Sequence, residues 1–167
     1  LLEFIRDGRS VAELMDLGFF DRDTEVERFF GMSIEQLQQK YGMPHDFRKA
    51  ASKALSALLD RPESQQAVIA VPPSGLMGGY LAVIKKTQRL KVVLLDTPER
   101  ILDRIVFYDA DSRPMDQRLT HEERPLYLKE IKTDLTYFKQ SYTRADPRVN
   151  IEDMELILSP MVIDAIE

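Results

Sequence analysis

Two carboxylates near the start of the chain are the first candidates for chemistry. Asp21 and Asp23 follow Phe19 and Phe20 at the end of a predicted strand. Their spacing of two places both side chains on the same side of an extended chain. In an α/β sheet, ligands bind at the carboxyl ends of the strands, which is where this pair stands. The simpler interpretation is a solvated strand-to-helix turn with Asp23 as N-cap, because Asp-x-Asp is a very common pair.

The turn after the next predicted strand is a second candidate. Pro72-Pro73 stand in this turn and cannot donate backbone N–H groups. Ser74 and Gly75 follow them, and they offer a hydroxyl group and a close approach of the backbone to a ligand. These residues fit a structural loop and a substrate pocket equally well.

A phosphate-binding loop of the pattern Gly-x-x-x-x-Gly-Lys-Ser/Thr occurs nowhere in the 167 residues. The nearest string is Gly8-Arg9-Ser10, which, with the helix-like residues 11–17 behind it, resembles a capped helix start. It lacks the first glycine, the intervening loop and the lysine. Arginine carries a positive charge, but its planar guanidinium is not equivalent to the compact ammonium group of lysine.

Short apolar runs alternate along the chain with segments of helical periodicity. The runs at residues 67–71 and 91–95 predict strands buried on both faces, and residues 148–151 predict a weaker strand. Strands that alternate with helices indicate parallel pairing through right-handed crossovers. The predicted fold class is therefore α/β, a three-layer α/β/α arrangement with a central parallel sheet.

Capping residues mark the helices that must position the candidate side chains. Ser33 opens a capping box for a helix that stops at Gly42, and a second helix spans residues 47–59. Thr97-Pro98 is an N-cap followed by proline at the first helical position. Thr120 opens another capping box and a longer helix, and Ser159-Pro160 predicts a short terminal helix.

Composition limits the classes of function. The chain of 167 residues fits a single domain over residues 1–167. With no cysteine it has no disulfide scaffold, thiolate metal site or cysteine nucleophile. A net charge of −5 argues against nucleic acid as a partner. No apolar run approaches membrane-spanning length and no leader begins the chain, so we expect a cytoplasmic protein, with a monomer favoured.

The order of these segments resembles the shikimate kinases, over about residues 14–130. In that family a strand ends in an Asp-x-Asp pair, a Gly-x-Ser-Ile segment leads to Phe-Arg, and a lid motif precedes an Arg-x-Pro-Leu-Tyr segment. The corresponding strings here are Asp21-Arg22-Asp23, Gly31-Met32-Ser33-Ile34, Phe47-Arg48, Asp96-Thr97-Pro98-Glu99, Ser112-Arg113-Pro114 and Arg124-Pro125-Leu126-Tyr127.

The resemblance implies a nucleoside-monophosphate-kinase-like fold and transfer of the ATP γ-phosphoryl group to the 3-hydroxyl of shikimate, with Mg²⁺. Asp21 would assist Mg²⁺, and Asp23 would bind the substrate hydroxyls and orient the nucleophile. Arg48 would grip the substrate carboxylate through a bidentate bond. Arg113 would contact the ATP phosphates and stabilise the transferring charge.

Further residues take roles by the same resemblance. Ser74, Gly75 and Arg124 would contact the substrate, and Arg9 and Ser10 would take the place of the phosphate loop. Each arginine also has a simpler interpretation, as an exposed helix residue for Arg48 and as a salt-bridged loop residue for Arg113. Arg124 is offset by one residue from the family position, where this chain has Glu123. In shikimate kinases three glycines stand in the turn that here contains Pro72-Pro73, and this difference puts shikimate itself in question.

Three explanations of the missing phosphate loop remain open. In the first, the loop lies upstream of Leu1, with the first helix enlarged and the N-terminal strand missing. In the second, the loop was deleted in nature. In the third, the chain shares only the fold of the family and not its function. The first hypothesis for function is ATP-dependent phosphorylation of a hydroxyl of shikimate or a related small hydroxy acid. The alternative is a non-catalytic ligand-binding or pseudokinase domain that acts as a sensor or interaction module.

Overall fold

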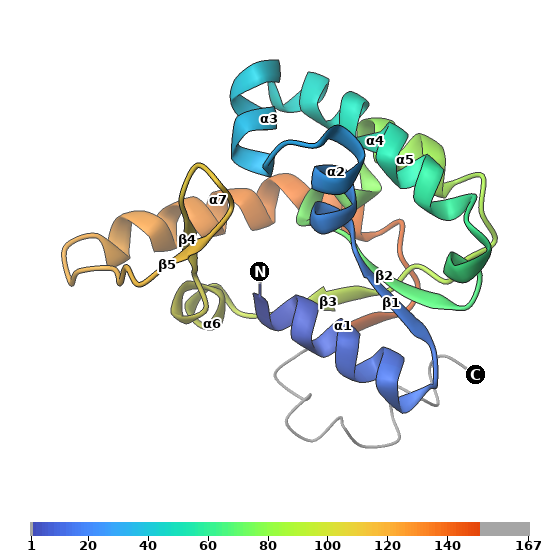
Figure 1. Ribbon diagram of the computed structural model, residues 1–167. Coiled ribbons are helices and arrows are strands. Elements are labelled where there is room, and N and C mark those ends of the chain that lie inside the picture. The colour runs from blue at the N-terminus through green and yellow to red at the C-terminus, as the bar shows by residue number, and fades with distance from the viewer. Residues whose placement is uncertain (1, 151–167) are drawn as a thin grey trace. The chain divides into compact units, whose positions relative to one another are not determined.

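The computed structural model describes residues 2–150, with their side chains from residue 8 onward (Figure 1). Two compact units are present. The first comprises the residues up to 87 together with 106–117, and the second comprises 88–105 together with the residues from 118 on. The expectation of one domain over residues 1–167 stays a prediction.

A parallel pair of strands forms the middle layer of the first unit. β1 (Gly18–Asp21) pairs with β2 (Ala67–Ala70), with Phe19 opposite Val68 and Phe20 opposite Ile69. Helix α1 (Leu2–Leu14) covers the face that carries Phe19, since a Cβ added to Gly8 would lie 3.1 Å from the Phe19 ring. Phe20 and Ile69 point to the other face, where they pack against the core. The alternation of side chains along the strands thus separates two helical layers.

Four helices build the core on the second face of this strand pair. They are α2 (Arg22–Phe30), α3 (Ile34–Tyr41), α4 (Pro44–Leu59) and α5 (Gly78–Ile84). The buried cluster consists of Val26, Leu37, Ala51, Ala54, Leu55, Leu58 and Tyr80. Figure 1 shows α4 and α5 side by side. Gly79 permits this close packing, because a Cβ there would lie 2.8 Å from Ser52 Oγ.

The predicted helix signals around α3 and α4 are confirmed. Ser33 forms a capping box with Gln36, and α3 is followed by Gly42 at its C-cap. Helix α4 ends at Leu59 as predicted, but it begins three residues earlier than predicted, at Pro44. Proline is favoured at the first helical position because no intrahelical partner exists there for an N–H group.

The segment predicted as a lid loop is a small antiparallel hairpin. β4 (Phe107–Tyr108) pairs with β5 (Pro114–Met115), and both belong to the first unit. The hairpin is attached to the start of α3. Ser33 Oγ donates to the Ala110 carbonyl oxygen over 2.6 Å, and Ser112 Oγ donates to the Glu35 carboxylate. The hairpin is therefore fastened at its tip to the capping box of α3.

The second unit repeats the strand-to-helix pattern. β3 (Val93–Leu95) pairs in parallel with β6 (Arg148–Asn150), and α6 (Pro98–Asp103) begins after Thr97, whose side chain caps it as predicted. Helix α7 (Arg124–Tyr142) follows the second predicted capping box, in which Thr120 and Glu123 bond each other reciprocally. The predicted terminal helix at Ser159-Pro160 lies outside the described residues.

The start of the chain differs from the sequence-based expectation. Gly8-Arg9-Ser10 does not begin a helix but lies inside α1, which starts at Leu2. The pattern misled because a glycine before a serine resembles a cap, whereas the residues upstream continue the helix. Short 3₁₀ turns complete the first unit, η1 (Pro62–Ser64) and η2 (Pro73–Leu76).

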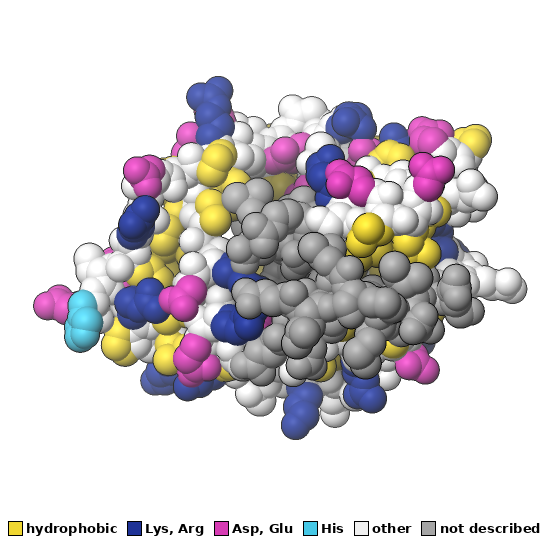
Figure 2. Space-filling model, turned by 90° about the horizontal axis from the view of Figure 1, so that it is seen from below, with side chains coloured by type: hydrophobic (Ala, Val, Ile, Leu, Met, Phe, Trp, Pro, Cys, Tyr) yellow, Lys and Arg dark blue, Asp and Glu magenta, His cyan; other side chains and the backbone are white. Residues whose placement is uncertain are grey.

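The described surface mixes both signs of charge. On the face shown in Figure 2, acidic and basic side chains are interspersed, as 23 basic and 28 acidic residues in the chain would suggest. Within residues 2–150 the structure has no helix that is both long enough and apolar enough to cross a membrane.

Candidate functional site

Asp21 caps the helix that carries the rest of the site. Its carboxylate accepts hydrogen bonds from the backbone N–H groups of Asp23, over 3.4 Å, and Thr24, over 3.2 Å. It also accepts from Thr24 Oγ1 over 2.9 Å. Because α2 begins directly after β1, Asp23 lies in the first helical turn and not on an extended chain. The expectation that both carboxylates share one side of a strand is therefore wrong, and so is the interpretation of Asp23 as N-cap.

Asp23 and its neighbour Arg22 form a partly buried ion pair. Arg22 is only 4% exposed, and its Nη1 lies 2.6 Å from Asp23 Oδ1. The two atoms are not aligned as a hydrogen bond, so both lack a hydrogen-bond partner among the described residues. Burial raises the pKa of Asp23, the Arg22 guanidinium opposes the rise, and the carboxylates of Asp21, Glu27 and Glu35 add to it.

Tyr80 lies beneath this ion pair. Its side chain is 1% exposed, and the guanidinium carbon of Arg22 lies 5.1 Å from the centroid of its ring. The hydroxyl of Tyr80 has no hydrogen-bond partner in the described part of the chain. Burial raises the pKa of Tyr80 to about 12; Asp23 also raises it, whereas Arg22 and Arg48 lower it. Sequence reasoning missed Arg22 and Tyr80, although an arginine between two aspartates was a visible signal.

Arg48 brings a second guanidinium to this cluster from α4. The side chain is half-buried, and its Nε has no hydrogen-bond partner among residues 8–150. A Cβ added to Gly78, at the start of α5, would lie 3.9 Å from this Nε. The backbone of Gly78 has a φ of +50°, which favours glycine. The structure thus brings Arg48 near Tyr80, on whose pKa the charges of both Arg48 and Asp23 act.

The cluster concentrates buried polar atoms that lack a hydrogen-bond partner among the described residues. Six buried side-chain polar atoms in the described residues have no hydrogen-bond partner, and five of them belong to Arg22, Asp23, Arg48 and Tyr80. Buried polar groups are nearly always paired, so such a shortfall needs an explanation. A guanidinium can bind a carboxylate, and a carboxylate can bind hydroxyl groups. The arrangement is therefore suited to a small hydroxylated acid.

The predicted turn residues Ser74 and Gly75 have local contacts. Gly75 N donates to the Pro72 carbonyl over 2.7 Å, and the Ser74 carbonyl accepts from Met77 N over 3.0 Å. A Cβ added to Gly75 would lie 2.6 Å from Val71 Cγ2, so the turn itself requires this glycine. The glycine next to Arg48 is Gly78 instead, in the Gly-Gly pair that sequence reasoning passed over.

The hairpin places Arg113 in the same unit as the cluster. Its side chain is 76% exposed, and Nη1 lies 4.0 Å from Asp111. The neighbouring Tyr108 lies within the electrostatic field of the aspartate pair, because burial and the charges of Asp21, Asp23 and Glu35 raise the pKa of its hydroxyl. The hairpin therefore lies near the end of β1 that carries Asp21.

The remaining predicted residues lie elsewhere. Arg9 and Ser10 are inside α1, and the Arg9 guanidinium lies 4.8 Å from the centroid of the Phe19 ring. Within a helix the backbone N–H groups bond to preceding carbonyls, so this tripeptide does not form a phosphate loop. Arg124 belongs to the second unit, where its Nη2 lies 2.5 Å from Asp103 Oδ1.

Comparisons with known proteins define the class. A family model described as shikimate kinase matches residues 7–159. The chain belongs to the shikimate kinase family. Curated relatives named shikimate kinase include one from Brucella canis, 28% identical in an alignment of 127 residues that covers 72% of this chain and 62% of that protein. One from Bradyrhizobium diazoefficiens is 27% identical in an alignment of 134 residues that covers 72% of this chain and 59% of the relative. The chain thus spans about 60% of the curated relatives it matches.

Solved structures agree with this assignment at the level of the fold. The shikimate kinase of Bacteroides thetaiotaomicron matches with a TM-score of 0.72 at 18% identity, over 94% of this chain and 89% of that one. The shikimate kinase of Aquifex aeolicus matches with a TM-score of 0.60 at 24% identity, over 93% and 89%. The resemblance to the family and the predicted three-layer α/β/α fold are therefore confirmed.

Proposed function

We propose that this chain binds a small carboxylated hydroxy acid at Asp23 and Arg48, as part of a shikimate-kinase-like phosphotransferase. The transferred group is the γ-phosphoryl of ATP, and the acceptor is a hydroxyl of shikimate or a related acid. The observation that carries the proposal is that one cluster holds five buried polar atoms without a hydrogen-bond partner among the described residues, two of which, Arg22 Nη1 and Asp23 Oδ1, form an ion pair with each other. Family membership supports it independently.

The charge of each residue sets the role that we propose for it. The Arg48 guanidinium binds the carboxylate of the acid, because it has no ion pair of its own among the described residues. Asp23 accepts hydrogen bonds from the hydroxyl groups and orients the one that attacks. Phosphoryl transfer needs this positioning, together with stabilisation of spread-out negative charge. Arg113, exposed on the hairpin, is the cation we assign to the phosphates. Ser74, Gly75 and Arg124 stay predicted substrate contacts.

A magnesium ion would be held by the carboxylate of Asp21, directly before α2. Mg²⁺ in phosphoryl-transfer sites is held by one or two carboxylates, with water and phosphate oxygens as its other ligands. Asp21 offers one such carboxylate, although no group of three or more potential ligands occurs in the described residues. When bound, the ion would neutralise charge on the phosphates of ATP.

Calorimetric titration of shikimate into the full-length protein tests the proposal. We expect binding that the substitution Arg48→Ala weakens about tenfold or more, since a charge-assisted hydrogen bond contributes about 1.5–3 kcal/mol. Arg28→Ala is the matched control, because the Arg28 side chain is 64% exposed and pairs with Glu25 away from the cluster. If the unmodified protein does not bind shikimate at millimolar concentration, or if both variants bind equally, the proposal fails.

A non-catalytic ligand-binding domain is the second candidate. It is favoured by one observation: Gly8-Arg9-Ser10, the string nearest to a phosphate loop, is helical. Such a domain would bind the acid without nucleotide. Titration of ATP with Mg²⁺ into the full-length protein separates the two candidates. Nucleotide binding supports the phosphotransferase, whereas acid binding with no response to millimolar ATP supports the sensor or interaction module.

A further inference from the structure

Arg22 contacts the carboxylate of Asp23, the residue proposed to bind the hydroxyl groups, on its buried side. Its side chain is almost fully buried, and Nη1 lies 2.6 Å from Asp23 Oδ1. Oδ1 is covered, yet the Asp23 side chain as a whole remains 25% exposed. The ion pair therefore occupies Oδ1, and we infer that Oδ2 is the oxygen that it leaves for a ligand.

The position of Arg22 is fixed by Tyr80. The guanidinium lies over the Tyr80 ring, 5.1 Å from its centroid, which is a cation–π geometry. Tyr80 is in turn fixed by the packing of α5 on α4, which Gly79 allows through its close approach to Ser52. Because the ring is buried at this helix contact, it offers the guanidinium a fixed surface to lie on.

We propose that Arg22, held on the ring of Tyr80, is a positioning residue that orients the Asp23 carboxylate so that Oδ2 receives a hydroxyl hydrogen of the acceptor acid. The inference rests on the proposed function, because it assumes that Asp23 binds the hydroxyl groups. It assigns to Arg22 an effect on hydroxyl recognition and none on the carboxylate, which Arg48 binds. That separation makes the proposal distinguishable from a general structural role.

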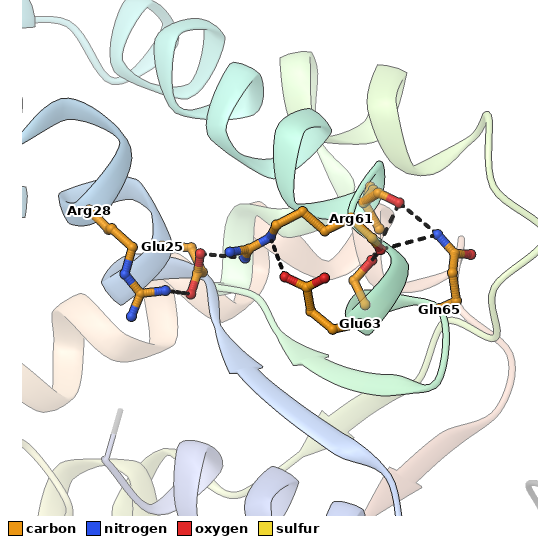
Figure 3. A network of polar contacts seen from close by, with 7 residues as sticks. Glu25, Arg28, Arg61, Glu63 and Gln65 are labelled. Carbon is orange, nitrogen blue, oxygen red and sulfur yellow. Dashed lines mark hydrogen bonds and ion pairs between the residues drawn. The ribbon is translucent and has the colours of Figure 1, made fainter.

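Another arginine of the same unit provides a matched control. Arg61 lies 5.1 Å from the centroid of the Phe20 ring, and its Nη2 lies 2.5 Å from Glu25 Oε2. Figure 3 shows this second network, in which Arg28 and Arg61 flank Glu25 and neither Asp23 nor Tyr80 takes part. A substitution of Arg61 therefore removes the same kinds of contact as one of Arg22, away from the proposed site.

Two ligands that differ only in their hydroxyl groups separate the effects. Shikimate carries the carboxylate and the hydroxyls, whereas cyclohex-1-ene-1-carboxylate carries the same ring and carboxylate alone. Affinities of the full-length protein for both are measured by ligand-observed NMR. We expect Arg22→Met to weaken shikimate binding about tenfold, the effect of losing one hydrogen bond to a charged group. Binding of cyclohex-1-ene-1-carboxylate changes less than about twofold, since its only charged contact is Arg48.

Further variants keep the test independent of folding. Arg22→Lys restores part of the shikimate affinity, because it keeps the cation but loses the planar fork and the stacking geometry. Arg61→Met lowers the unfolding temperature and leaves both affinities unchanged. In an Asp23→Asn background, Arg22→Met has no further effect on shikimate affinity, because the two residues act through one contact.

The outcomes separate the two proposals. If the unmodified protein binds neither acid, the proposed function fails and this inference fails with it. If shikimate binds but Arg22→Met weakens both acids equally, or weakens neither, the positioning role is wrong and the proposed function stands. The positioning role is also wrong if the effect of Arg22→Met is undiminished in the Asp23→Asn background.

Discussion

The ionisation of the Tyr80 hydroxyl tests the buried part of the candidate site most directly. Its pKa is about 12 in the folded chain, against an ordinary value of 10.0. Two pKa units correspond to about 2.7 kcal/mol of differential stability. Below pH 10 the hydroxyl is neutral in both states, so this stability is fully present. As the pH rises from 10 to 12 the unfolded chain ionises first, and the stability is lost. At pH 11.5 the loss amounts to about 2 kcal/mol.

The substitution Tyr80→Phe removes this pH dependence. Near neutral pH the variant should be as stable as the unmodified chain or slightly more so, because the hydroxyl it deletes has no partner among the described residues. A tyrosine whose hydroxyl is well bonded would instead lose about 1 kcal/mol on the same change. On going to pH 11.5 the variant should then gain about 2 kcal/mol of unfolding free energy relative to the unmodified chain.

Urea unfolding followed by far-ultraviolet circular dichroism at several pH values from 8 to 11.5 measures this difference. Tyr137→Phe is the control, because Tyr137 is 59% exposed and its loss should leave the pH dependence unchanged. If this difference stays constant between pH 8 and 11.5, or if Tyr80→Phe is clearly less stable at pH 8, the claim that the Tyr80 hydroxyl is buried without a hydrogen-bond partner is wrong.

Three further predictions concern α2. Asp21→Ala should destabilise the chain by about 1 kcal/mol through loss of the N-cap, while Asp21→Asn should retain most of the stability, as thermal unfolding would reveal. Glu25→Gln should destabilise by about 3 kcal/mol in urea unfolding, because it leaves Arg61 without its buried partner; destabilisation below about 0.5 kcal/mol would contradict the network. Because burial raises the pKa of Asp23, we expect shikimate affinity to fall on acidification at a pH above the ordinary range for aspartate. If the affinity is constant between pH 4 and 7, while a stability measurement shows that the protein stays folded at these pH values, Asp23 does not bind the substrate.

Local capping chemistry could be predicted from the sequence because it depends on neighbours in the chain. Ser33 with Gln36 and Thr97 with Pro98 were predicted as helix starts, and both are confirmed. Gly8-Arg9-Ser10 failed for the same reason, since a short window cannot tell a cap from a glycine inside a longer helix. The parallel pairing followed from alternation of strands and helices and is confirmed in both units.

The composition of the candidate site depends on contacts between distant segments, which the sequence could not provide. Tyr80 matters because α5 packs on α4 and brings its ring under Arg22, from 58 residues away in the chain. Which glycine lies beside Arg48 depends on such a contact too: Gly75 and Gly78 both follow the strand, and Gly78 is the one near Arg48 Nε, while the role predicted for Gly75 stays a prediction. Asp23 and Arg48 were predicted as substrate-binding residues because the family resemblance linked them, and that role stays a prediction.

A crystal structure of the full-length protein with shikimate tests the central claim most directly. We expect the carboxylate of the acid on the guanidinium of Arg48 and a ring hydroxyl within hydrogen-bond distance of Asp23 Oδ2, with Arg22 still on the Tyr80 ring. Shikimate bound elsewhere, or bound here with its carboxylate away from Arg48, would contradict the account.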